Sequence, residues 1–533
     1  MSERVTAESR WNALLQYRSI YLRRAIDCSQ LTIPSLIPES DQWDNAGQTE
    51  AKLPSLYQGL GGKSVNGLSA KLLLALYPPS QPFFRLVIHE GKLQEYIGRQ
   101  GGGGGEEEIR SRMDSSLALV ERSILKKLDE LQARPALFEA MKHLITGGNA
   151  LLHVGDDGIR MYGLRSFTCR RDPEGNVCEI VLKERVARDF IPSSMLDGSE
   201  DDDDTHVDLY TWIRCNHEDD RCEWHQEYDG RIVPNTTGFS PLESSGWLCL
   251  RLLRCANEDF GRSLVEEAIG DLQSLESLSR AVVEGSLISA KAIALVNPNG
   301  VTRADVLARS ENGAVVAGNI QDVEFLTVGK QGDLGVALQT MQVLERRLNF
   351  TFLNNESTTR DAERVTAEEI RLMAEQLEAG LGGIYSILAH ELQLPLIRRI
   401  LALMTKAGEI PPVPPEIISP QITTGLDAIG RGNDKQRLTS FLQTIAASIG
   451  PEAFIQYIEP SELIRRFAAA DGIETNGLVK DQQQLQAEQA QQQRANLEQS
   501  LTEGAIRNGA TDPTQQQAAV SGGTAPVTPP SGN

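Results

Sequence analysis

The spacing of apolar side chains predicts helices in the first part of the chain. Residues 6–29 and 64–77 each carry apolar side chains three or four positions apart, and prolines follow both segments. Residues 106–146 continue this spacing up to Gly147 and Gly148, a pair that is typical of a helix C-terminus. We therefore expect helices in all three ranges.

The middle of the chain changes to a strand pattern. A short apolar run at 150–154 is typical of a buried strand. Residues 167–171 and 177–186 flank an Asp-Pro-Glu-Gly-Asn segment, and residues 207–215 and 222–228 flank a second polar turn. These patterns predict two β-hairpins.

Helical spacing returns in the second half of the chain. It covers 260–290 and 333–352, and the segment between them, 292–330, has strand and turn composition. A further helix is expected over 366–406, because the range begins with a capping box and keeps its apolar stripe. Pro395 should kink or interrupt this last helix.

Polar and glycine-rich segments separate these elements. Five glycines at 101–105 and the acidic run at 199–204 are expected to be surface loops. The prolines at 411–415 indicate a stiff linker, and 434–472 has the pattern of a small helical unit. Residues from 476 onward are rich in Gln and then in Gly, Pro and Thr, a composition that is typical of an extension and a disordered tail.

The composition is that of a soluble, multidomain chain. It has 533 residues, of which 40% are hydrophobic and 23% are charged, and it has no apolar run long enough to span a membrane. Seven scattered cysteines argue against a disulfide framework, and the polar N-terminus does not resemble a signal peptide. We expect a protein that is cytosolic when made and an α+β fold that is mainly helical.

The formal net charge of −21 limits how the chain can handle nucleic acid. Proteins that grip DNA usually present a basic patch to the phosphates. An acidic wall would instead repel the phosphate backbone and let DNA slide past. Taken alone, the charge favours the simpler interpretation that it keeps a large protein from aggregating.

Two motifs suggest catalysis but lack the full pattern. Gly62-Lys63-Ser64 resembles the end of a phosphate-binding loop, yet the position that requires the first glycine is Tyr57, and no strand pattern leads into it. His390-Glu391 lacks the second histidine of a zinc-protease helix, because Leu394 occupies that position. We therefore predict that the protein is not an enzyme.

One group of side chains has residue types that bind zinc but not the usual spacing. If Cys215, His217, Cys222 and His225 lie on a hairpin, Cys215 and His217 share one face, whereas Cys222 and His225 point to opposite faces. The four side chains cannot easily converge on one ion. We predict neither a metal nor a cofactor.

Several long segments resemble a known family. The segments EDFGRSLVEEAIGDLQSLESLSRAV, ISAKAIALVNPNG, ERVTAEEIRLMAEQLEAGLGGIYSILAHELQLPLIRRIL and ITTGLDAIGRGND, from 258–300 and 363–434, are similar to the portal, or head-to-tail connector, proteins of T7-type short-tailed phages of the podovirus and autographivirus group. LTIPSLIPES, NGLSAKLLLALYPP and GGNALL also fit. The resemblance covers roughly residues 5–475, whereas the five-glycine run, the acidic run and the tail look individual to this chain.

The resemblance implies a portal fold whose subunits form a ring, a homododecamer, around a central channel. The domains that it implies for this chain are a wing at 1–255, a stem helix at 256–291, a clip at 292–330, a second stem helix at 331–353, a tunnel loop at 354–364, a long wing helix at 365–410, a crown at 411–475, and a Gln-rich extension and tail at 476–533.

The same resemblance implies which residues meet DNA. Carboxylates between the apolar positions of the first stem helix are candidates for the channel wall: Glu266, Glu267 and Asp271. The sequence does not determine which face of this helix points into the channel. The tunnel loop supplies the candidates for transient contact: Asn354, Asn355, Glu356, Ser357, Thr358, Thr359 and Arg360. For Arg360, a salt bridge to Asp361 or Glu363 is an equally good interpretation.

The function that the resemblance implies is a conduit. The ring would sit at the head-tail vertex of the virion, carry the genome during packaging and ejection, and serve as a docking platform for the packaging motor and then the tail. The implied partners are other copies of the chain, double-stranded DNA, the terminase large subunit, a tail adaptor or tubular protein, the major capsid and scaffolding proteins, and internal core proteins. A capsid scaffold without a channel and, less plausibly, a packaging ATPase are the alternatives.

Overall fold

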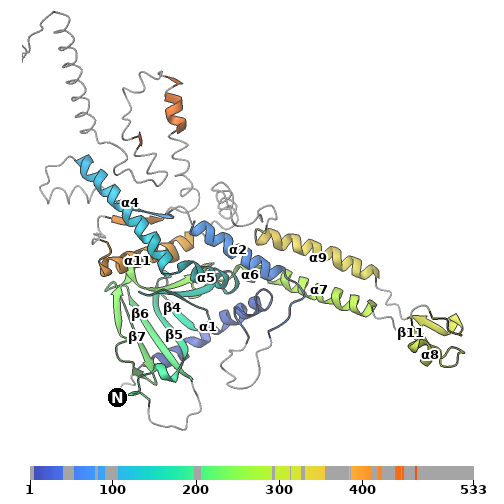
Figure 1. Ribbon diagram of the computed structural model, residues 1–533. Coiled ribbons are helices and arrows are strands. Elements are labelled where there is room, and N and C mark those ends of the chain that lie inside the picture. The colour runs from blue at the N-terminus through green and yellow to red at the C-terminus, as the bar shows by residue number, and fades with distance from the viewer. Residues whose placement is uncertain are drawn as a thin grey trace, which may run out of the picture. The chain divides into compact units, whose positions relative to one another are not determined.

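The computed structural model describes most of the first 410 residues and short segments beyond them (Figure 1). The described residues are 5–39, 53–78, 82–89, 106–196, 206–290, 294–311, 314–325, 331–354, 383–384, 386–410, 418–422, 439–445, 447–448 and 463–464.

A six-stranded antiparallel sheet is the largest β element. Its strand order is β4-β5-β6-β7-β8, and β9 also pairs with β7. The predicted hairpins are confirmed, because β4 pairs with β5 and β6 with β7. The bounds of the strands are β4 (Phe167–Arg171), β5 (Val177–Ala187), β6 (His206–Asn216), β7 (Arg221–Tyr228), β8 (Arg231–Ile232) and β9 (Gly238–Pro241), with the 3-10 turns η1 (Arg188–Phe190) and η2 (Leu242–Ser244) beside them.

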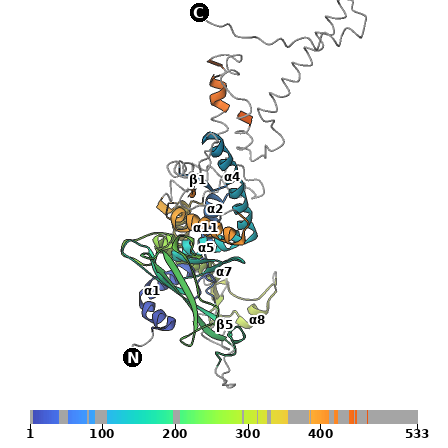
Figure 2. The same ribbon diagram turned by 90° about the vertical axis from the view of Figure 1, so that its left-hand side faces the viewer.

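Helix α1 (Ala7–Gln30) covers this sheet at β4, β5 and β6 (Figure 2). Its N-terminus is fixed by a capping box in which the Thr6 hydroxyl accepts from the amide of Ser9. Trp11 and Leu14 are buried against Val181 and Trp212 of the sheet. The predicted helix over 6–29 is therefore confirmed to within one residue at each end.

A second sheet lies in the main hydrophobic core. Its order is β10-β2-β3, with bounds Trp247–Arg251, Asn149–Val154 and Ile159–Tyr162. Helices α2 (Leu60–Leu76), α4 (Glu106–Glu130) and α5 (Ala133–Gly147) contribute buried side chains to the same core. The stretch predicted as helix over 106–146 is two helices, because Gln132 adopts a left-handed conformation between them.

Gly148 ends α5 at a position that only glycine fits. Its φ is +74°, and a Cβ there would come within 2.5 Å of the Arg262 backbone. The close approach joins the end of α5 to the segment that precedes the next helix.

Two long helices, α7 (Ile269–Ala290) and α9 (Gln331–Thr351), lie side by side (Figure 1). We call them the α7–α9 pair. The helix predicted over 260–290 starts later, as α6 (Leu264–Glu267), and is interrupted at Ala268. Near α6, the pair belongs to the main core through Leu272 and Leu348.

The segment between α7 and α9 forms a small folded unit. β11 (Ala294–Val296) pairs with β12 (Val323–Phe325), and η3 (Ile320–Asp322) precedes β12. The Asp322 carboxylate accepts from the amides of Val301 and Thr302, at 2.8 and 3.1 Å. The short helix α8 (Ala304–Arg309) was not expected in a range predicted as strand and turn.

The last part of the long predicted helix approaches the core again. A π-helix, η6 (Ala389–Gln393), leads into α11 (Leu394–Ala407), whose first turn contains Pro395. The predicted interruption at Pro395 is confirmed as this change of helix type. β13 (Ile418–Ile422) then pairs with β1 (Phe84–Ile88), a pairing that the sequence did not indicate.

The chain divides into two compact units, residues 1–428 and 429–533. In the second unit, residues 439–445, 447–448 and 463–464 are helical, in agreement with the small helical unit predicted at 434–472. In the described residues, no helix combines the length and apolar character needed to span a bilayer. Several predictions fall outside the described residues: the loops at 101–105 and 201–204, the capping box at 366–369, the proline linker, most of the crown, and the tail.

Candidate functional site

The predicted acidic residues lie where α6 and α7 meet α9. Glu266 forms an ion pair with Arg24 of α1 at 3.4 Å, and Asp271 forms one with Arg347 of α9 at 3.1 Å. Glu267 is exposed, and the salt bridges within the described residues do not involve it. Two of the three carboxylates are thus already neutralised inside the chain, so Glu267 offers the least compensated negative charge.

A fourth carboxylate, in α7, is buried. Glu276 is 8% exposed, and its oxygens accept from the backbone amides of Tyr57 at 3.1 Å and Gln58 at 3.2 Å. Sequence spacing places Glu276 between apolar positions, as it does Glu267. The two backbone amides that donate to it lie more than 200 residues away in sequence, so no local pattern could have distinguished the two roles.

The first residue of the predicted tunnel loop is anchored on α2. Asn354 donates from Nδ2 to the Ser64 hydroxyl at 2.6 Å, and its backbone amide donates to Asn349 at 2.8 Å. Lys71 donates to the carbonyl of Leu353 at 2.5 Å, and burial lowers the pKa of Lys71. The remaining candidates, Asn355 to Arg360, lie outside the described residues.

This anchor also gives Ser64 of the Gly62-Lys63-Ser64 motif a structural role. Ser64 is fully buried inside α2 and is bonded to Asn354. Residues 53–59, which lead into α2, contain no strand. The strand–loop–helix context that a phosphate-binding loop needs is therefore missing at this motif.

Apolar side chains are exposed along the α7–α9 pair. Val336, Val343 and Phe350 follow one another at seven-residue spacing on α9 and are 64%, 54% and 81% exposed. Leu287 and Ile288 of α7 are 60% and 54% exposed. A seven-residue repeat forms a continuous stripe on a helix, which is the usual form of a surface that packs against another helix.

The segment between the two helices also exposes apolar side chains. Val301 is 78% exposed, Ile320 is 89% exposed, and Val315 is fully exposed. More than half of the exposed large apolar side chains in the described residues lie between 283 and 350. These elements therefore carry more uncovered apolar surface than the rest of the described chain.

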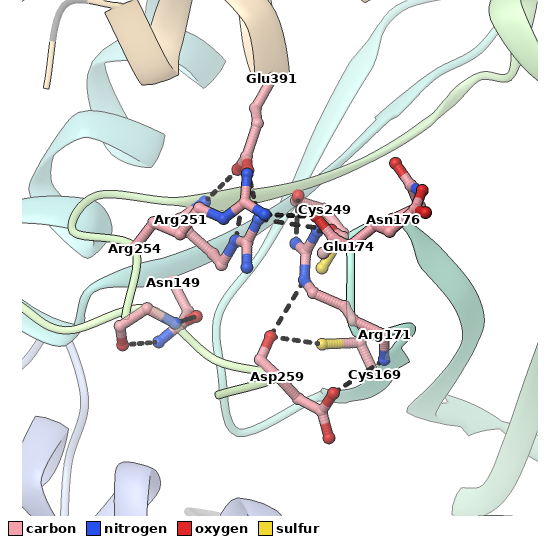
Figure 3. A network of polar contacts seen from close by, with 12 residues as sticks. Asn149, Cys169, Arg171, Glu174, Asn176, Cys249, Arg251, Arg254, Asp259 and Glu391 are labelled. Atoms are coloured by element: carbon pink, nitrogen blue, oxygen red, sulfur yellow. Dashed lines mark hydrogen bonds and ion pairs between the residues drawn. The ribbon is translucent and has the colours of Figure 1, made fainter. Parts of the chain in front are cut away.

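A buried polar network joins the start of this region to the sheets (Figure 3). Arg251 of β10 is 2% exposed and donates to Glu391 of the π-helix, with 2.6 Å between Nη2 and Oε1. The Arg251 amide donates to the same carboxylate at 3.1 Å. Glu391, which the sequence suggested only as part of an incomplete protease motif, is thus a structural acceptor.

A second arginine extends the network to the segment before α6. Arg171 donates to the carbonyls of Asp259, Gly175 and Cys249, at 3.0, 3.0 and 2.9 Å (Figure 3). Its own amide donates to the Asp259 carboxylate at 2.8 Å. The β4–β5 turn, strand β10, the π-helix and the segment that leads into α6 are therefore held together by the guanidinium groups of the buried Arg251 and the partly buried Arg171.

The four side chains considered for zinc do not converge on one point: the two cysteines contact each other, and each histidine contacts a different residue. The sulfur atoms of Cys215 and Cys222 lie 3.0 Å apart, and His225 contacts Glu227 at 2.8 Å. His217 instead contacts the carbonyl of Val177, at 2.9 Å. The hairpin thus does not bring these four residues together.

Comparison with known proteins identifies relatives over almost the whole chain. Residues 4–479 match the family described as bacteriophage head to tail connecting protein. The portal protein of Escherichia phage T7 is 37% identical over 497 residues, which cover 91% of this chain and 90% of that protein. The portal proteins of Enterobacteria phages T3 and SP6 are 36% and 30% identical, over 90% and 93% of this chain and 89% and 94% of those proteins.

Among solved structures, the neck of a native gene transfer agent particle matches with a TM-score of 0.31 and 13% identity, over 78% of this chain and 91% of that one. This similarity is too weak to carry an argument.

Proposed function

Because this chain belongs to the family of bacteriophage head to tail connecting proteins, we propose that it is a portal protein whose ring is the conduit for genome packaging and ejection. The observation that carries the proposal is the family match over residues 4–479, together with portal proteins that are 36–37% identical over nine-tenths of the chain. The proposed role is structural and needs no catalysis.

The proposed ring contains twelve copies, with the α7–α9 pair as the stem and 294–325 in the clip. The stripe of Val336, Val343 and Phe350 supports self-association, because a helix face this apolar is unfavourable in water. A second copy of the same pair is the occupant that we propose. In a closed ring every stem packs between two neighbours, which leaves no stripe uncovered.

The proposed channel combines an acidic wall with a contact loop. Glu267 supplies the wall charge, and one carboxylate per subunit becomes a circle of negative charge in a ring. The segment from Asn354 to Arg360 is proposed to meet DNA, with its first residue fixed on α2. If Arg360 contacts DNA, Arg360→Ala will reduce packaging or ejection, whereas unchanged packaging and ejection would leave the salt bridge to Asp361 or Glu363 as its role.

The proposed partners follow the order of assembly. They are the major capsid and scaffolding proteins, the terminase large subunit during packaging, a tail adaptor or tubular protein afterwards, and internal core proteins. The wing at 1–255, the long wing helix at 365–410 and the crown at 411–475 are proposed to face these partners or the head interior. The proposed location is the head-tail vertex of the virion.

The test substitutes residues of the apolar stripe on α9 and measures by negative-stain imaging how much of the protein forms rings. Purified wild-type protein is expected to give twelve-fold rings with a central hole in negative-stain images. Val336→Asp and Val343→Asp each place a charge in the proposed subunit interface and should shift the protein to monomers.

Ile20→Asp is the matched control. Ile20 is an exposed apolar helix residue, 57% exposed, outside the stem, so its variant should still form rings. If the wild-type protein forms closed particles without a hole, the proposed function as a conduit is overturned. Rings that persist in both stem variants would overturn the proposed interface.

A further inference from the structure

Two hairpin turns meet at one end of the six-stranded sheet. The β4–β5 turn occupies 172–176, and the β6–β7 turn occupies 217–220. Strands β5 and β6 pair antiparallel up to Glu179 opposite Arg214, so the start of β5 lies beside the end of β6. Residues from both turns therefore come together, although about 40 residues separate them in sequence.

Three potential metal ligands of different chemistry gather there. The ligand atoms of Asp172, Cys178 and His217 all lie within 4.8 Å of one another. Asp172 and Cys178 are partly buried, and His217 is exposed. A carboxylate, a thiol and an imidazole are all side chains that bind zinc in proteins.

The imidazole of His217 is held in the tautomer that a metal needs. Its Nε2 lies 2.9 Å from the carbonyl oxygen of Val177. A carbonyl oxygen only accepts hydrogen bonds, so Nε2 carries the proton and Nδ1 keeps a lone pair. Histidine ligands of metals commonly donate their other N–H to a backbone carbonyl in this way.

The carboxylate of Asp172 is also oriented by its neighbours. Its Oδ1 accepts from the Asn176 amide at 2.7 Å, and its Oδ2 accepts from Asn176 Nδ2 at 2.9 Å. Each oxygen retains a second lone pair that is available to an ion.

We propose that Asp172, Cys178 and His217 bind one Zn²⁺ ion, with water as the fourth ligand. Thiolate and imidazole favour zinc over magnesium or calcium, which prefer oxygen ligands. Ligand atoms of tetrahedral zinc lie roughly 3.3–3.8 Å apart, given bonds of about 2.0–2.3 Å. The ligand atoms lie no more than 4.8 Å apart, so the largest separation needs to shrink by at most roughly 1.5 Å for all three to bind one ion.

The site would tie the two turns to each other. Asp172 and Cys178 come from one hairpin and His217 from the next, so the ion would add a second link to the hydrogen bond between His217 and the Val177 carbonyl. Binding to the folded form alone raises the stability of the sheet. The inference rests on these three side chains and does not depend on ring formation.

The test uses Co²⁺ as a spectroscopic probe in the full-length protein after chelator treatment. One Co²⁺ per chain is expected, with a thiolate-to-cobalt charge-transfer band and the strong visible bands of tetrahedral cobalt, and Zn²⁺ should displace it. Cys178→Ser should abolish the charge-transfer band. Asp172→Asn and His217→Ala should weaken Co²⁺ binding by at least about tenfold, the loss that even an outer-shell partner causes.

Cys255→Ser is the matched control, because Cys255 is also a half-buried free cysteine but lies outside the cluster. Its variant should keep the wild-type spectrum. Absence of the charge-transfer band in the wild type would overturn the proposal. So would a band that survives in Cys178→Ser and disappears in Cys222→Ser, because the ion would then sit at the Cys215–Cys222 pair. If Cys178→Ser misfolds, the exposed His217→Ala decides the outcome alone.

Discussion

Among the described residues of the α7–α9 pair, apolar side chains are buried only near α6, although Phe350 at that same end is exposed. Near α6, Leu272 and Leu348 are fully buried in the main core. Toward the segment 294–325, Leu287 and Val336 are 60% and 64% exposed. One helix pair thus contributes to the main core near α6, whereas its exposed stripe of Val336, Val343 and Phe350 is the surface proposed to pack against another copy. The comparison separates residues that stabilise the subunit from residues that are proposed to assemble it.

The largest expected effect tests the buried end of this comparison. Arg251→Ala leaves Glu391 without its guanidinium partner in a buried setting, and loss of one partner of a buried pair costs about 3–5 kcal/mol. Denaturant unfolding of Arg251→Ala should show this loss. Arg254→Ala, at an exposed arginine of the same network, should change the free energy of unfolding by only about 0.5 kcal/mol. If the two variants lost the same free energy of unfolding, burial would not determine how much each arginine contributes to stability.

The second prediction compares two apolar residues on one helix. Leu348→Ala opens a cavity in the core and should lower the free energy of unfolding by about 2–5 kcal/mol. Val343→Ala removes an exposed side chain and should change it by no more than about 0.5 kcal/mol. Both are measured in the Val336→Asp background, so that assembly does not contribute. A large loss for Val343→Ala alone would show that its face is covered within the subunit.

The third prediction concerns acid sensitivity of the core. Burial first, then Arg399 and Arg160, lowers the pKa of His153 to about 4, while Asp156 opposes the shift. His153 also stacks on Trp247 with ring centroids 4.0 Å apart. The unfolded chain, with a histidine pKa of about 6.5, binds more protons between these two values. The stabilisation is complete above about pH 6.5 and is lost as the pH falls toward 4.

The size of this effect can be measured directly. Lowering the pH from 7 to 5 should cost about 2 kcal/mol through His153. His153→Phe keeps a ring against Trp247 but cannot titrate, so its unfolding should depend less on pH in this window. An unchanged pH dependence would show that His153 is not the group responsible.

The smallest effect is expected at an ion pair on the surface near α6. Asp271 and Arg347 form a partly exposed ion pair, with Arg347 63% exposed, so solvent screens it strongly. A double-mutant cycle with Asp271→Asn and Arg347→Gln should give a coupling of about 0.2–1 kcal/mol that decreases with salt. A coupling of several kcal/mol would contradict this expectation, because it would mean that the pair is shielded from solvent as the Arg251–Glu391 pair is.

Periodicity predicts elements whose hydrogen bonds are local. The long helices, both hairpins of the large sheet and the interruption at Pro395 follow from residue patterns within about twenty positions, whereas the short α8 does not. The pairing of β1 with β13 joins segments more than 300 residues apart. Each strand alone is too short to give a recognisable strand pattern in the sequence. Long-range pairing depends on the whole core, which a local pattern does not contain.

The candidate site shows the same limit for polar residues. Glu267 and Glu276 look alike in the sequence, yet one is exposed and the other accepts from the backbone of residues 57 and 58. His217 has the residue type of a metal ligand, but its neighbours come from the adjacent hairpin and not from its own. Sequence identified the chemistry of these groups, and the fold determined their partners.

The measurement that tests the central claim most directly is a cryo-EM reconstruction of the purified particle at side-chain resolution. The account predicts a twelve-fold ring in which Val336 and Val343 are buried against a neighbouring copy, and Glu267 and the segment from Asn354 to Arg360 face a central channel. A particle without a channel, or a ring in which the Val336 stripe remains open to solvent, would contradict it.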